Sequence, residues 1–159
     1  MSYKWIEEAQ RNIGVREIKG PRHNAIILRW LDKLKAWWHD DETPWCGVFV
    51  AHCIQSAGLP MPRYWMRASD WLNWGRPLSG PMFGCVAVFT RKGGGHVGFV
   101  VGKDKLGNLL ILGGNQGDAV NVKAFPVSRV SGFRFPHGVA ITAAALPVSN
   151  GVELSTSEA

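Results

Sequence analysis

The hydrophobic pattern of the chain changes near residue 80, and this change limits the folds it can adopt. Before it, apolar residues recur at helical spacing, which predicts amphipathic helices at about residues 3–13, 24–37 and 44–57, with a short one near 68–74. After it, short apolar runs alternate with glycine turns, which predicts strands at 85–89, 97–101 and 109–112, and weaker ones at 122–125 and 132–135. Helices followed by strands predict an α+β fold with N-terminal helices packed on an antiparallel β-sheet.

The length of the chain predicts a single domain. At 159 residues, a chain can bury roughly 68–70% of its unfolded surface without disulfides or metals. After Ile141 the sequence is rich in small and polar residues and has no apolar period. We therefore expect a domain over residues 1–140 and a flexible C-terminal tail over residues 141–159.

The net charge of +6 favours an anionic partner, such as nucleic acid, a membrane surface or the bacterial wall. The basic residues are scattered and form no dense run, so nucleic-acid binding rests on bulk charge alone, and we do not expect it. No segment approaches the ~18 apolar residues of a membrane span, and the N-terminus does not resemble a signal peptide. The sequence predicts a monomer made in the cytoplasm.

The stretch DETPWCGVFV places Cys46 at the start of a predicted helix, with Thr43 as N-cap and Pro44 as first helical residue. Free N–H groups and the helix dipole there can lower a thiol pKa from ~8.5 to ~3.5–7.5. Cys46 is thus a candidate nucleophile. It also shares a helical stripe with Val50 and Cys53, so the alternative is a small core residue.

The other two cysteines, Cys53 and Cys85, are expected in the core. Neither lies at a predicted helix start, and three cysteines without metal-ligand spacing indicate neither a disulfide framework nor a metal site.

A nucleophilic thiol needs a base, and His96 is the strongest candidate. It follows three glycines in GGGHVGFVVG and begins an alternating strand, so space is left beside it. The next strand ends at Asn115, and an antiparallel hairpin would bring Asn115 beside His96, where it could orient the imidazole. Alternatively, His96 is a surface residue at a strand edge and Asn115 belongs only to a turn. Asp118 lies too far along that turn.

Several motifs in this order resemble the papain-like NlpC/P60–CHAP superfamily of cell-wall cysteine hydrolases, and more closely its phage-associated, endolysin-like branch: DETPWCGVFV, RASDWLNWG, VAVF, GGGHVGFVVG and GGNQGDAV. The resemblance covers about residues 3–136 and implies a papain-like NlpC/P60 (CHAP-like) fold. It implies Cys46 as nucleophile, His96 as base and Asn115 as the polar third residue, without metal or cofactor. Residues expected to contact substrate are Trp45, Trp65, Trp71, Trp74 and Gln116, although core packing is equally consistent with each tryptophan.

The resemblance implies a peptidoglycan hydrolase that cuts an amide bond. The bond lies either within the stem peptide, as for an endopeptidase, or between muramic acid and L-alanine, as for an N-acetylmuramoyl-L-alanine amidase. A phage or prophage endolysin would reach the periplasm and cell wall from the host cytoplasm through a holin. An injected antibacterial effector would use a secretion system, and a non-catalytic wall-binding module would need no Cys–His pair.

Overall fold

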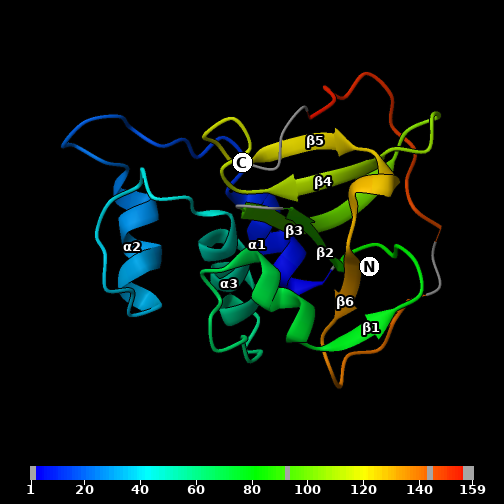
Figure 1. Cartoon of the computed structure of the whole chain (residues 1–159), viewed down its shortest axis with the longest axis horizontal. Coiled ribbons are helices and arrows are strands. Elements are labelled where there is room, and N and C mark those ends of the chain that lie inside the picture. The colour runs from blue at the N-terminus through cyan, green and yellow to red at the C-terminus, as the bar shows by residue number, and fades with distance from the viewer. Residues whose placement is uncertain (1–2, 92–93, 143–144, 156–159) are drawn as a thin grey trace.

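The computed structural model describes residues 3–91, 94–142 and 145–155, and it confirms the α+β class (Figure 1). The predicted helices form, each shorter than its apolar pattern. Their bounds are α1 (Lys4–Arg11), α2 (Ala25–Lys33), α3 (Cys46–Ser56) and the 3-10 helix η1 (Ala68–Asn73). A second 3-10 helix, η2 (Val127–Arg129), follows the fifth strand.

Six antiparallel strands form one sheet in the order β1-β6-β2-β3-β4-β5. Their bounds are β1 (Arg76–Leu78), β2 (Val86–Arg91), β3 (Gly94–Lys103), β4 (Leu109–Gly113), β5 (Asn121–Phe125) and β6 (Gly132–Phe135). All five predicted strands are present. The sequence pattern missed β1 because it has three residues and contains Pro77, which lacks a backbone N–H and is tolerated on an edge strand.

Helix α3 is the centre of the molecule. Figure 1 shows it between α2 and the sheet, with α1 alongside. Its residues from Cys46 to Ile54 are all buried, as expected for a helix that is apolar on every side. Phe49 packs against Phe99 of β3 at 6.3 Å between ring centroids, while His52 stacks on Trp30 of α2 and its Nε2 lies 2.7 Å from a carboxylate oxygen of Glu8 in α1.

The start of α3 differs from the prediction. The helix begins at Cys46, its N-cap is Trp45, and no side chain caps it. Thr43 belongs instead to the preceding turn, where its backbone N–H donates to the carboxylate of Asp40. Cys46 is therefore the first helical residue, and its backbone N–H has no partner within the helix.

The chain beyond the sheet returns along it. Residues 147–149 pair with Lys103 at the end of β3, and residues 153–155 pair with Ala124 of the edge strand β5. A salt bridge of 2.8 Å joins Lys123 to Glu153. The structure thus gives backbone partners to part of the segment expected to be flexible, while the division into a domain of residues 1–140 and a tail of residues 141–159 stays a prediction.

Truncation after Ala145 tests these contacts. It removes the backbone hydrogen bonds to Lys103 and Ala124, each worth about 0.5–1.5 kcal/mol net. We expect a cooperative unfolding transition with Tm lowered by several degrees, since 1 kcal/mol shifts Tm by roughly 2–4 °C at this size. Glu153→Ala, which removes only an exposed ion pair, should leave Tm nearly unchanged. An unchanged Tm after truncation would show that the segment does not hold these positions in solution.

Candidate active site

The sulfur of Cys46 lies at the junction of α3 and β3. It accepts backbone N–H groups from Val97, the residue after His96, and from Gly47, and these hydrogen bonds favour the thiolate. Burial works in the opposite direction and is the larger effect, so the pKa of the Cys46 thiol is raised above its ordinary value. Only 7% of the residue is exposed. The direction of this pKa shift is opposite to the lowered pKa that the sequence suggested.

His96 is buried on β3, within an aromatic environment. Its ring stacks on Phe125 at 5.5 Å between centroids and 9° between planes, and Phe89 lies 5.9 Å away. Its Nε2 lies 2.9 Å from the side-chain oxygen Oε1 of Gln116. Since that oxygen can only accept, Nε2 carries the proton, and in the neutral imidazole Nδ1 is the basic nitrogen.

The orientation of Gln116 is fixed by its amide nitrogen. Nε2 of Gln116 donates to the carbonyl oxygen of Ile111 at 3.1 Å and to the backbone and side-chain oxygens of Asn121, both at 2.9 Å. Three acceptors surround the nitrogen, so a flipped amide would direct an oxygen at three oxygens. The side-chain oxygen must therefore face His96.

The hydrogen bond predicted for Asn115 is thus made by its neighbour. Asn115 adopts φ 59°, in the left-handed region that asparagine tolerates better than most residues. This turn directs the next side chain, Gln116, towards His96. Gln116, expected to contact substrate, is instead buried in this hydrogen-bond network.

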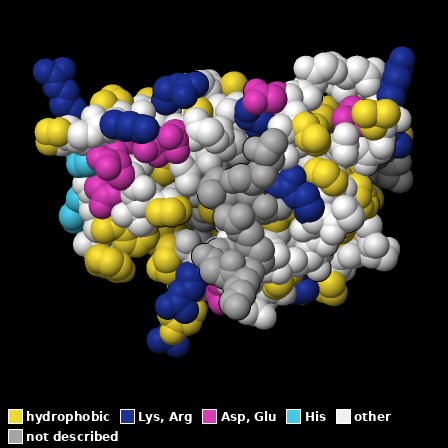
Figure 2. Space-filling model, turned by 45° about the horizontal axis from the view of Figure 1, so that its top comes forward, with side chains coloured by type: hydrophobic (Ala, Val, Ile, Leu, Met, Phe, Trp, Pro, Cys, Tyr) yellow, Lys and Arg dark blue, Asp and Glu magenta, His cyan; other side chains and the backbone are white. Residues whose placement is uncertain are grey.

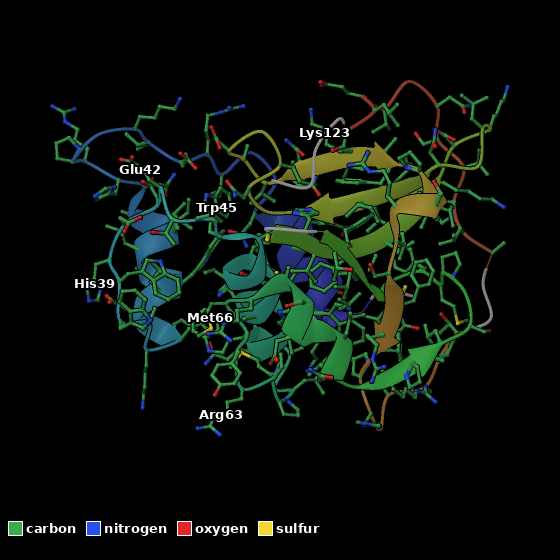
Figure 3. The ribbon with its side chains drawn as sticks, viewed as in Figure 1. His39, Glu42, Trp45, Arg63, Met66 and Lys123 are labelled. Carbon is green, nitrogen blue, oxygen red and sulfur yellow. The ribbon has the colours of Figure 1, made fainter. Side chains whose placement is uncertain are left out.

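The four tryptophans expected to contact substrate are all buried. Their exposed fractions are 1% for Trp45, 8% for Trp65, 0% for Trp71 and 6% for Trp74. The indole N–H of Trp71 donates to the carbonyl of Trp65, and that of Trp45 to the carboxylate of Glu17. In Figure 3, Trp45 lies beside α3, between α2 and the sheet. Large apolar rings with satisfied N–H groups are core residues, so the structure does not place them on an exposed substrate wall.

One group of side chains has the geometry of a cation site. Ligand atoms of His23, Asp41 and Glu42 lie within 4.8 Å of one another. Their oxygens are already used: Asp41 accepts the backbone N–H groups of Ile18 and Asn24 and bonds to His23. Burial raises the pKa of Asp41, but these hydrogen bonds outweigh it and the net pKa is lowered. Through these hydrogen bonds the group joins two loops.

Cys53 and Cys85 are buried free thiols, as predicted. Burial raises the pKa of Cys53 well above its ordinary value and that of Cys85 to about 12. Cys46 differs from both in position, because it opens α3 and its sulfur accepts the N–H of Val97, the neighbour of His96, so it remains the candidate nucleophile.

In a comparison with known families, the model of the CHAP domain matches residues 38–115. This segment includes Cys46 and His96 and ends at Asn115, one residue before Gln116. No curated protein matches the chain. Across the described residues, no helix is long and apolar enough to cross a membrane.

Exchange of Gln116 for alanine tests the geometry around His96. Without the acceptor, the imidazole loses its fixed tautomer, and we expect kcat/KM for the hydrolysed bond to fall by about tenfold or more. The matched control is Asn115→Gly, which accepts a positive φ and should retain most of the activity. A folded Gln116→Ala enzyme with an unchanged pH–rate profile would contradict the assignment.

Proposed function

Because the chain belongs to the NlpC/P60–CHAP superfamily, we propose that it hydrolyses an amide bond of peptidoglycan by a thiol mechanism. Cys46 is the nucleophile, His96 the base and acid, and Gln116 the residue that orients the imidazole. The observation that carries this proposal is the 2.9 Å contact between His96 and Gln116, which leaves Nδ1 basic while Val97, next in the strand, donates to the Cys46 sulfur.

The first step is attack by the sulfur on the amide carbonyl carbon. The raised pKa of Cys46 means that its proton must leave as the C–S bond forms, and Nδ1 of His96 accepts it. The resulting imidazolium remains hydrogen-bonded through Nε2 to Gln116. The amide oxygen becomes an oxyanion, which the N–H of Cys46 and the positive end of α3 stabilise.

The second step breaks the C–N bond. The imidazolium returns its proton to the leaving amine, and the acyl group remains on sulfur as a thioester. A water molecule, deprotonated by His96, then attacks the thioester and releases the carboxylate and the free thiol. Bond cleavage consumes one water and needs no redox partner.

For the biological setting, we propose a phage or prophage endolysin that acts as endopeptidase or N-acetylmuramoyl-L-alanine amidase. It would be made in the host cytoplasm and reach the wall through a holin. The family match supports a wall hydrolase.

Removal of Cys46 or His96 tests the mechanism. Either Cys46→Ala or His96→Ala should abolish the loss of turbidity of outer-membrane-permeabilised Gram-negative cells. The double variant should be hardly slower than either single one, because members of one catalytic unit are not additive. Cys53→Ala is the matched control and should retain lysis, with at most a modest loss of stability. A folded Cys46→Ala protein that still lyses the cells would refute the thiol mechanism.

The ionisation state of Cys46 gives an independent test. A thiol whose pKa is raised is protonated below that pKa, so its alkylation by iodoacetamide should accelerate as pH rises through the alkaline range. The rate is followed by peptide mass spectrometry in the Cys53→Ala, Cys85→Ala background. A rate that is already maximal and flat from pH 6 would indicate a resting thiolate–imidazolium pair and contradict the general-base step.

A further inference from the structure

Two aromatic side chains are exposed near the start of α3. Trp37 is 84% exposed and Tyr64 is 40% exposed. The guanidinium groups of Arg63 and Arg67 lie 5.4 and 4.9 Å from the centroid of the Tyr64 ring. We call Trp37, Arg63, Tyr64 and Arg67 the aromatic–arginine surface. Two exposed rings together with two guanidinium groups form a candidate binding surface.

A chain of ring contacts connects this surface to the active site. Trp37 packs edge-on against Trp38 at 5.3 Å between centroids, and Trp38 lies 6.0 Å from Trp65. The carbonyl oxygen of Trp65 lies so close to Gly47 that a Cβ there would clash with it. The surface therefore adjoins the first turn of α3, which carries Cys46. In Figure 3, Met66 lies beside α3 and Arg63 projects away below it.

The loop that carries Arg63 and Arg67 is held in place by hydrogen bonds to η1 and to Trp74, the residue after it. Trp71 donates its indole N–H to the carbonyl of Trp65 at 3.0 Å, and Trp74 donates to the carbonyl of Pro60 at 2.7 Å. The backbone N–H of Tyr64 donates to Asp70. A surface fixed before binding loses little conformational entropy when a ligand arrives.

The charges of the surface are not neutralised internally. Among the described residues, neither Arg63 nor Arg67 forms an ion pair with a carboxylate. Guanidinium groups bind carboxylates in bidentate geometry, and the exposed rings offer flat apolar faces. Pyranose rings present apolar C–H faces that pack on such rings. The surface therefore fits a sugar polymer that carries carboxylates.

We propose that the aromatic–arginine surface binds the glycan strand of peptidoglycan and presents the attached stem peptide to Cys46. Trp37 stacks on a sugar ring, while Arg63 and Arg67, which lie over the Tyr64 ring, bind stem-peptide carboxylates. This rests on the proposed function, which supplies the polymer. Nucleic acid also stacks on aromatic rings, but its backbone needs a continuous basic track. In the view of Figure 2, Lys and Arg are scattered, and acidic side chains gather at one corner.

Binding is measured by sedimentation with purified, insoluble sacculi, using the Cys46→Ala protein so that bound polymer is not cut. In this background we add either Trp37→Ala or the pair Arg63→Ala and Arg67→Ala. Each change should raise the apparent Kd at least about tenfold, which is the loss expected when one hot-spot contact is removed. The matched control is Lys105→Ala with Leu106→Ala, which removes one cation and one 88% exposed apolar side chain from the β3–β4 turn. The control should bind as its parent does.

A second readout separates binding of the polymer from chemistry. In the wild-type background, Trp37→Ala should slow digestion of sacculi far more than turnover of a small soluble muramyl peptide, which contains the amide bonds of the stem and the bond to muramic acid. Unchanged binding and digestion of sacculi by both surface variants would overturn the proposal but leave the hydrolase intact. Conversely, the wild-type protein could bind sacculi in a way that depends on Trp37 and yet cleave no bond. That result would support the proposed binding surface and contradict the proposed hydrolase activity. If the surface variants lost binding to single-stranded DNA but bound sacculi normally, the surface would be assigned to nucleic acid and the proposal would be overturned.

Discussion

The site depends on the environment of one amide nitrogen. Three oxygens, from Ile111 and Asn121, surround Nε2 of Gln116, so Oε1 has a single favourable direction, towards His96. An acceptor on Nε2 determines which imidazole nitrogen is basic, and hence how His96 can take the proton of Cys46. In a buried network of this kind, low local polarity strengthens each hydrogen bond.

The fold brings the reacting groups together from elements that are far apart in sequence. α3 is buried along its length and cannot shift relative to β3 without opening the core. Its first turn has no capping side chain, so its N–H groups remain available beside the cysteine. The loop after β4 packs closely against this turn. At Gly114 there is no room even for a Cβ atom, which would clash with the side chains of Trp45 and Phe49. Cys46, His96 and Gln116 are therefore all held by packed elements of one core.

The fold could largely be predicted from the sequence, since periodicity identified the helices and five strands. The position of Cys46 at a helix start and of His96 after three glycines predicts their catalytic roles, and these roles stay a prediction. The sequence predicted Asn115 as the partner of His96, whereas Gln116 makes that hydrogen bond, because a left-handed φ at Asn115 redirects the next side chain. The sequence also could not separate core from exposed tryptophans: Trp71 is fully buried, whereas Trp37 is largely exposed. These outcomes depend on tertiary packing and on which indole N–H finds a partner, and neither leaves a periodic signal.

The central claim is that Cys46 cleaves an amide bond of peptidoglycan. Mass spectrometry of purified peptidoglycan, digested with the wild-type protein and with Cys46→Ala, tests it most directly. The account predicts fragments that each gain one water at an amide, with a new amine and a new carboxylate, and none from the Cys46→Ala protein. The position of the new amine identifies the bond. Fragments with new reducing sugar ends, or identical fragments from both proteins, would contradict the claim.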